Sequence, residues 1–225
     1  MAATLRWALE LPPGFFADVV GLYALLAALV VQFLPAGAAR SENLGAANRV
    51  TLLRATLLLP ICALVLSPAP VTNVACWWII GASTGAMALD GVDGAVARRT
   101  GGATRFGARF DMELDAFLML ALAVLVWRSG QTGPWVLFIG ALRYLFVAAG
   151  RIWPVLAGDL PPRFRRKLVC VIQGVALLVC LGPIIPPDVA STVAATALAL
   201  LLYSFAVDVH WLLAHAAAAP VPDRA

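Results

Sequence analysis

The sequence predicts an all-α fold, a polytopic membrane helix bundle. Of the 225 residues, 62% are hydrophobic and 12% are charged, and the mean hydropathy is +0.92. A soluble domain has about 25% charged residues, so this composition excludes an ordinary soluble globule and a disordered chain. The apolar residues also gather in long segments separated by Pro, Gly and charged clusters. Since a helix needs ~20 residues to cross ~30 Å of hydrocarbon, the chain has room for six or seven spans with short loops.

Seven apolar segments are expected to form the helices. They cover residues 17–34, 50–67, 74–89, 110–127, 135–150, 168–185 and 189–213. The first includes Asp18 and is longer than the apolar core of a secretory signal, so we interpret it as a retained span. In the third, the spacing of Gly81, Gly85 and Ala88 predicts close helix packing. Most tryptophans lie at segment ends, as in the aromatic belts of membrane proteins.

Basic residues are concentrated in alternate loops of this order. Loops 36–49, 91–109 and 151–167 contain Arg40, Arg49, Arg98, Arg99, Arg105, Arg109, Arg151, Arg163, Arg165, Arg166 and Lys167, whereas loops 68–73, 128–134 and 186–188 contain only Arg128. The positive-inside rule places the first set of loops in the cytoplasm. The net charge is +4, and we therefore expect the basic residues to contact membrane lipids and no nucleic acid.

Acidic residues gather between the third and fourth segments. Five of the twelve lie within residues 90–115, and they are Asp90, Asp93, Asp111, Glu113 and Asp115. On helices, Asp90 and Asp93 share one face, as do Asp111 and Asp115. A short turn around residues 100–102 would bring these four carboxylates together, and their mutual repulsion calls for cations. Oxygen donors suit Mg²⁺, Mn²⁺ or Ca²⁺, and the lack of nearby Cys or His argues against zinc.

The same residues form a recognisable motif. The stretch Asp90-Gly-Val-Asp93-Gly94-Ala-Val-Ala97-Arg98, then eight residues, then Gly107-Ala-Arg-Phe-Asp111-Met-Glu-Leu-Asp115 resembles the signature D-x2-D-G-x2-A-R-x8-G-x3-D-x3-D of the class I CDP-alcohol phosphotransferase family, also called CDP-alcohol phosphatidyltransferases. All eight fixed positions match. Upstream, Asn48-Arg-Val-Thr51-Leu-Leu-Arg54 is similar to the N-x-x-T-x-x-R with which the family's first core helix begins.

The resemblance implies a domain organisation. Residues 48–215 would form the family's six-helix transmembrane core, preceded by one extra N-terminal span and a cytoplasmic linker in residues 1–47. Residues 216–225 would form a short C-terminal tail. The expected location is the bacterial inner (cytoplasmic) membrane with the active site facing the cytoplasm. The oligomeric state stays open, a homodimer included.

The resemblance also implies an activity in phospholipid synthesis. A phosphatidyl group would pass from a CDP-linked donor, expected to be CDP-diacylglycerol, to a small alcohol, with release of CMP. Asp90, Asp93, Asp111 and Asp115 would hold two divalent cations, Mg²⁺ or Mn²⁺, and Asp115 would also be the general base. The residues implied in binding the donor nucleotide are Asn48, Thr51, Arg54, Gly94, Ala97, Arg98 and Gly107.

Surplus positive charge predicts a phosphorylated acceptor. Arg105, Arg109, Arg143 and Arg151 exceed what the donor requires, and Arg can bind a phosphate through two parallel hydrogen bonds. We therefore expect glycerol 3-phosphate or an inositol phosphate. Because Arg143 lies within an apolar segment, a structural ion pair is an equal alternative for that residue.

Two other classes of function remain open from the residues alone. A metal-dependent membrane pyrophosphohydrolase or phosphatase would use the same cations to activate water. An ion-coupled transporter would also have membrane carboxylates, but typically near the bilayer midplane on discontinuous helices. The carboxylates of this chain are instead concentrated in one expected hairpin at the cytoplasmic edge, which favours an enzyme.

Overall fold

The computed structural model describes residues 14–33, 46–100, 105–158, 160–161 and 163–217, and side chains within 14–28, 53–89, 111–158, 160–161 and 163–215. The elements in this part of the chain are α2 (Gly14–Phe33), α3 (Ala46–Leu66), α4 (Asn73–Thr100), α5 (Arg105–Arg128), η2 (Pro134–Val136), α6 (Leu137–Ile152), η3 (Pro154–Ala157), α7 (Phe164–Cys180) and α8 (Pro187–Ala217). The described residues contain no strand, so the all-α prediction is confirmed.

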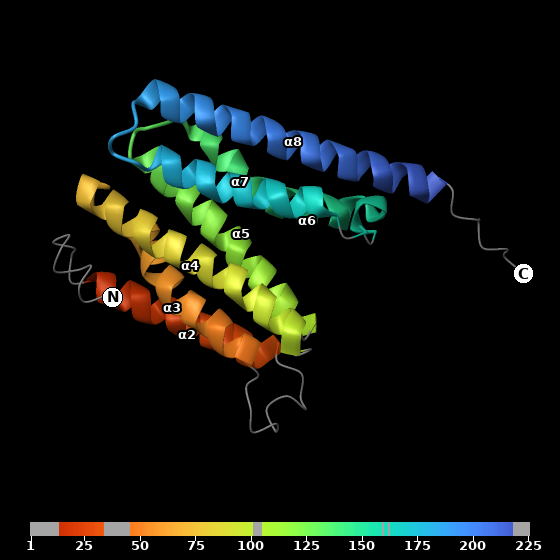
Figure 1. Cartoon of the computed structure of the whole chain (residues 1–225), viewed down its shortest axis with the longest axis horizontal. Helices are drawn as coiled ribbons and strands as arrows, with labels where there is room; N and C mark the ends of the chain where they lie inside the picture. Colours follow the sequence, from red (N-terminus) through yellow and green to blue (C-terminus); the bar gives the residue numbers. More distant parts are fainter. Residues whose placement is uncertain (1–13, 34–45, 101–104, 159, 162, 218–225) are drawn as a thin grey trace, which may run out of the picture.

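Consecutive helices run in opposite directions. The C-terminal ends of α2, α4, α6 and α8, and the N-terminal ends of α3, α5 and α7, lie toward the right of Figure 1. The basic loops that the sequence places in the cytoplasm therefore all connect helix ends on this one side. Arg128, the basic residue of the alternate loops, ends α5 on the opposite side.

Helix α5 occupies the centre of the bundle. It packs against α3, α6 and α7, while α3 also contacts α2 and α4. Leu118, Leu122 and Leu125 of α5 are at most 1% exposed and lie in the main apolar core. Because α5 is fixed on three sides, the carboxylates near its N-terminal end have a rigid support.

A glycine allows the closest approach between α5 and α6. A Cβ atom added to Gly140 would lie 2.8 Å from the backbone nitrogen of Leu120 and 3.0 Å from the carbonyl oxygen of Met119. Gly81 and Gly85 of α4, in contrast, have no atom within 4 Å of such a Cβ position and are exposed. The prediction that these two glycines mediate close packing is therefore wrong within this chain, because no described atom of a neighbouring helix lies against them.

Two arginines hold helix ends together on opposite sides of the bundle. Arg128 donates hydrogen bonds to four carbonyl oxygens at the end of α3 and just beyond it, those of Leu64, Val65, Ser67 and Ala69, at 2.6–3.0 Å. At the other side, Arg165 of α7 donates to both oxygens of Ser204 at 2.7 Å and forms an ion pair with Asp208 of α8 at 2.5 Å. These contacts satisfy carbonyls and charges that burial would otherwise leave unpaired.

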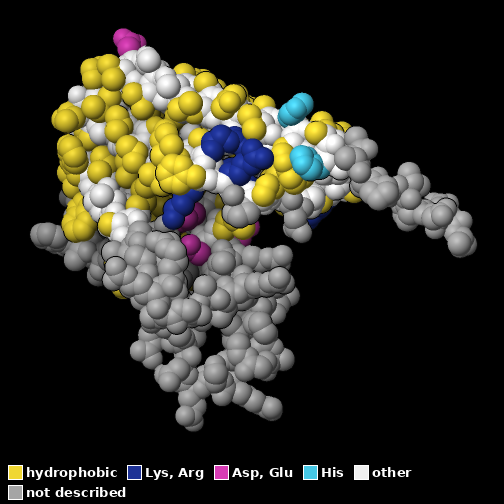
Figure 2. Space-filling view, turned by 45° about the vertical axis from the view of Figure 1, so that its right-hand side comes forward, with side chains coloured by type: hydrophobic (Ala, Val, Ile, Leu, Met, Phe, Trp, Pro, Cys, Tyr) yellow, Lys and Arg dark blue, Asp and Glu magenta, His cyan; other side chains and the backbone are white. Residues whose placement is uncertain are grey.

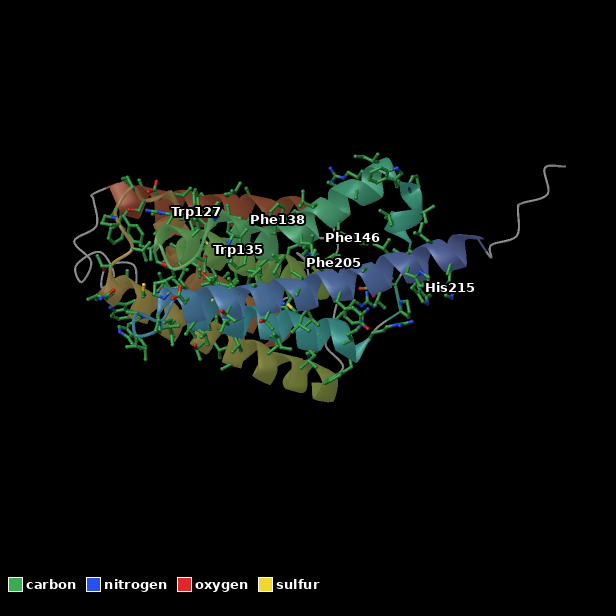
Figure 3. All side chains as sticks on the ribbon, turned by 90° about the horizontal axis from the view of Figure 1, so that it is seen from above. Trp127, Trp135, Phe138, Phe146, Phe205 and His215 are labelled. Carbon is green, nitrogen blue, oxygen red and sulfur yellow. The ribbon has the colours of Figure 1, made fainter. Side chains whose placement is uncertain are left out.

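Part of the predicted membrane topology is visible in the described residues. Two stretches are long and apolar enough to span a membrane by length and composition, Pro134–Ile152 and Pro187–His215. Shorter apolar helical stretches occur at Gly14–Ala28, Leu53–Leu66 and Asn73–Leu89. Trp127 and Trp135 lie toward one end of the bundle and His215, stacked on Trp211, lies toward the other (Figure 3). The division into a six-helix core and one extra span stays a prediction.

We expect Gly140→Ala to destabilise the protein and Gly81→Ala not to. The new methyl group at position 140 would meet α5 backbone, and overpacking of this kind costs about 1–3 kcal/mol. At position 81 the same change meets open space and gains helix propensity. Thermal unfolding of both variants in the same detergent measures the difference, and equal melting temperatures would contradict the close α5–α6 contact.

Candidate active site

The residues of the family-like motif lie on two consecutive helices. Asp90, Asp93, Gly94, Ala97 and Arg98 are in the last turns of α4, and Gly107, Asp111 and Asp115 are in the first turns of α5. The connection between them, residues 101–104, is short, as the sequence predicts. The side chains of residues 90–110 lie outside the described part of the structure, as do those of Asn48 and Thr51 at the start of α3. The expected meeting of four carboxylates therefore stays a prediction.

Two of the four carboxylates are described, and both contact one arginine. The guanidinium of Arg54, on α3, donates through one terminal nitrogen to Oδ1 of Asp111 and through the other to Oδ1 of Asp115. The Arg54 side chain is 1% exposed, whereas the Asp111 and Asp115 side chains are 36% and 29% exposed. The carboxylates thus have one side against a buried cation and another side accessible from outside. The resemblance implies nucleotide binding for Arg54, which stays a prediction, and the structure adds contacts of Arg54 with two carboxylates.

The described carboxylates fit a role as ligands of divalent cations. Asp111 and Asp115 are one helical turn apart on the same face, and their oxygens already converge on a positive charge. Carboxylate oxygens are the donors that Mg²⁺ and Mn²⁺ prefer. No group of three or more potential metal ligands occurs within the described residues, because the remaining two candidates, Asp90 and Asp93, lie outside them.

A large apolar groove leads away from this polar site. Its volume is about 690 Å³. Side chains of α4 and α7 form its walls, including Trp77, Thr84, Val171 and Val175, and Leu118 and Met119 of α5 line it between them. Arg54, Asp115 and Lys167 lie at one end, and Gly182, Ile184 and Ile185 lie beyond α7 at the other. Figure 2 shows basic and acidic side chains gathered where a broad hydrophobic surface ends.

The sequence places Lys167 among the cytoplasmic basic residues, but it does not predict the groove or assign Lys167 and the α7 residues to its lining. Lys167, Val171, Val175 and Val179 are spaced by four residues, so they share one face of α7. This spacing in the sequence could have predicted an apolar face of the helix with the polar Lys167 at its end. Cys170 also lines the groove and is exposed, while Cys62, Cys76 and Cys180 are buried.

The arginines expected to bind the acceptor have different surroundings. Arg143 of α6 forms an ion pair with Glu113 of α5 at 2.6 Å. Glu113 is two residues from both Asp111 and Asp115, so it points to another side of α5. This contact favours the ion-pair alternative for Arg143. Arg151 is exposed at the end of α6, and the side chains of Arg105 and Arg109 lie outside the described residues.

Comparison with known proteins identifies the class of enzyme. Residues 44–211 match the family model of the CDP-alcohol phosphatidyltransferases, and the chain belongs to this family. It is 32% identical over 171 residues to the probable phosphatidylglycerophosphate synthases of two Mycobacterium tuberculosis strains, covering 74% of this chain and 79% of each relative. No solved structure gives a significant match. The protein is therefore a membrane transferase of phospholipid synthesis that uses a CDP-alcohol donor and an alcohol acceptor, in a family that uses divalent metals.

We expect Arg143 and Glu113 to act as an ion pair inside an apolar part of the bundle. Each of Arg143→Met and Glu113→Gln leaves the other charge unpaired, so each should destabilise the protein, and a double-mutant cycle should show that the two losses do not add. Both variants should keep the KM for the acceptor alcohol. A raised acceptor KM in Arg143→Met, absent from Glu113→Gln, would instead assign Arg143 to acceptor binding.

Proposed function

We propose that this enzyme transfers the phosphatidyl group of CDP-diacylglycerol to glycerol 3-phosphate at the cytoplasmic face of a bacterial inner membrane. The observation that carries this proposal is the apolar groove that ends at Asp115, Arg54 and Lys167. A donor with a nucleotide diphosphate head and acyl chains needs such a change from polar to apolar lining. The family assignment supplies the reaction, and the groove supplies the argument for a lipid-linked donor.

The groove suits the hydrocarbon part of the donor. Its volume lies in the range of small-molecule sites, about 300–1,000 Å³. Most of its lining is apolar, and its long walls come from α4 and α7. With the acyl chains along Val171, Val175 and Leu178, the diphosphate would lie beside Asp115 and the last turns of α4. Asn48, Thr51, Gly94, Ala97, Arg98 and Gly107 are the residues we propose for the nucleotide.

Asp115 is the proposed general base. It would accept the proton of the acceptor hydroxyl, whose oxygen forms a new bond to the phosphatidyl phosphorus while the bond between that phosphorus and the CMP oxygen breaks. Asp90, Asp93, Asp111 and Asp115 would hold two divalent cations. Such cations neutralise charge on the diphosphate and on the departing CMP. The partial exposure of Asp111 and Asp115 leaves them accessible to cations and substrates.

Positive charge at the groove end supports a phosphorylated acceptor. Lys167 lines the groove beside Asp115. Arg105, Arg109 and Arg151 belong to helix ends on the same side of the bundle. The relatives named phosphatidylglycerophosphate synthase favour glycerol 3-phosphate over an inositol phosphate.

The test is an acceptor competition with the purified chain in detergent. We expect CDP-diacylglycerol and Mg²⁺ or Mn²⁺ to give phosphatidylglycerophosphate and CMP in equal amounts from a mixture of glycerol 3-phosphate, inositol phosphate, serine, inositol and choline. Mass spectrometry of the lipids and chromatography of CMP measure both products. Preference for an unphosphorylated alcohol would overturn the acceptor, and CMP release without any acceptor would indicate a hydrolase.

Asp115→Asn should reduce turnover by about 10²–10⁴-fold, the usual effect of losing a general base. Part of the donor affinity should remain, because the groove is unchanged. Glu113→Gln is the matched control, since it removes a carboxylate from the same helix turn at a position that contacts Arg143 instead. Steady-state kinetics and donor binding measure both variants. Turnover of Asp115→Asn close to that of the control would remove Asp115 as the base.

Occupancy of the groove should protect Cys170 from alkylation. It is the one exposed cysteine of the four, so a maleimide reagent should modify it first. CDP-diacylglycerol should slow this modification several-fold, whereas CDP alone should not, because only the acyl chains would extend from the polar end along the apolar part of the groove that Cys170 lines. Mass spectrometry of the labelled protein gives the rates. Equal protection by CDP would argue against acyl chains in this groove.

A further inference from the structure

Arg54 is the largest side chain among the most deeply buried residues of the described structure. It is 1% exposed, and its α3 neighbours Ala55 and Leu58 are also at most 1% exposed in the apolar core. A buried guanidinium is costly unless it is paired and hydrogen-bonded. Its two terminal nitrogens contact Asp111 and Asp115, two residues proposed to bind cations.

The contact engages the same kind of atom that a metal ion would use. Each carboxylate is bound to Arg54 through its Oδ1 atom. The lone pair directed at the Arg54 N–H group is not available to a cation at the same time, which reduces the set of oxygen sites that each carboxylate can offer. Arg54 is also a fixed positive charge next to the site, which disfavours further positive charge there.

We propose that Arg54 is an internal counter-cation that competes with divalent cations for Asp111 and Asp115. This inference rests on the proposed metal role of these residues. Arg54 balances the two carboxylates when cations leave, and it thereby sets the concentration at which cations bind. It is a positioning residue, because it acts on the reaction through Asp111 and Asp115.

The consequence is a reciprocal linkage. If cation binding weakens the Arg54–carboxylate contacts, those contacts must weaken cation binding by the same factor. Removing the guanidinium should then have two opposite effects. The cation-free protein should lose stability, because two carboxylates on consecutive turns repel each other and would lose the compensating charge of Arg54. The cation-bound protein should lose much less stability when the guanidinium is removed, and the protein's affinity for cations should rise.

The experiment compares Arg54→Met with Arg165→Met in the full chain in detergent. Arg165 is a suitable control because it pairs with Asp208 and Ser204 between α7 and α8, away from the motif residues. Mn²⁺ binding is measured by electron paramagnetic resonance, and melting temperatures are measured in chelator and in millimolar Mn²⁺. Arg54→Met should bind Mn²⁺ about tenfold more tightly than the unaltered protein, since charged hydrogen bonds are worth roughly that factor or more.

The melting temperatures give a second readout. Mn²⁺ should raise the melting temperature of Arg54→Met more than that of the unaltered protein. Any decrease in the melting temperature of Arg165→Met should be the same with and without Mn²⁺. Arg54→Lys, which keeps the charge but not the two-pronged shape, should fall between the unaltered protein and Arg54→Met in Mn²⁺ affinity.

Other outcomes would overturn the inference in distinguishable ways. Unchanged or weaker Mn²⁺ binding in Arg54→Met would show that Arg54 does not compete with the cation. Failure of Arg54→Met to fold even in Mn²⁺ would make Arg54 a structural tether that a cation cannot replace. Absence of Mn²⁺ binding by the unaltered protein would remove the proposed metal site itself, and the inference with it.

Discussion

The ion pairs between Arg54 and the two carboxylates of α5 constrain the rest of the bundle. In this structure the buried Arg54 guanidinium contacts both carboxylates, and these contacts set the rotation of α3 relative to α5 as well as the distance between them. Helix α5 in turn packs against α6 and α7, and α3 packs against α2 and α4. The rotation of α5 directs Asp111 and Asp115 to one side of the helix and leaves Glu113 to pair with Arg143 on another. One buried charge thus couples helix packing to the arrangement of the site.

The same rotation produces the change from polar to apolar chemistry along one helix face. Asp111, Asp115 and Met119 follow one another at four-residue intervals on α5, and Lys167, Val171 and Val175 do so on α7. In both series the charged residues lie near the basic helix ends, and the apolar residues lie farther from those ends. An amphiphilic substrate can therefore place its head and its chains without a separate binding domain. A bundle of helices can in this way present a polar site and an apolar groove side by side.

Helix content could be predicted from composition, and the motif could be predicted from spacing, because both depend on local sequence. The apolar segments 74–89 and 110–127 underestimate the lengths of α4 and α5. The charged motif is helical too, since α4 ends and α5 begins within it. The contacts of Arg54 could not be predicted, because along the sequence Asp111 is 57 positions and Asp115 is 61 positions away from Arg54. The orientation of Gly81 was also beyond local reasoning, since small residues suit both a packed face and an exposed one. The side chains of Asp90 and Asp93 lie outside the described residues, so that half of the site rests on spacing and family membership.

The shape of the Arg54 side chain explains why two carboxylates separated by one turn can share it. Residues i and i+4 of a helix have Cβ atoms about 5–6 Å apart, a separation that a single ammonium group spans poorly. The guanidinium is a planar fork whose two terminal nitrogens point to different partners, and here one reaches Asp111 and the other Asp115. A divalent cation solves the same problem differently, by accepting oxygen ligands from several directions. The four-residue spacing of these aspartates therefore suits both kinds of positive charge, and this is the geometric basis for the competition that we propose between them.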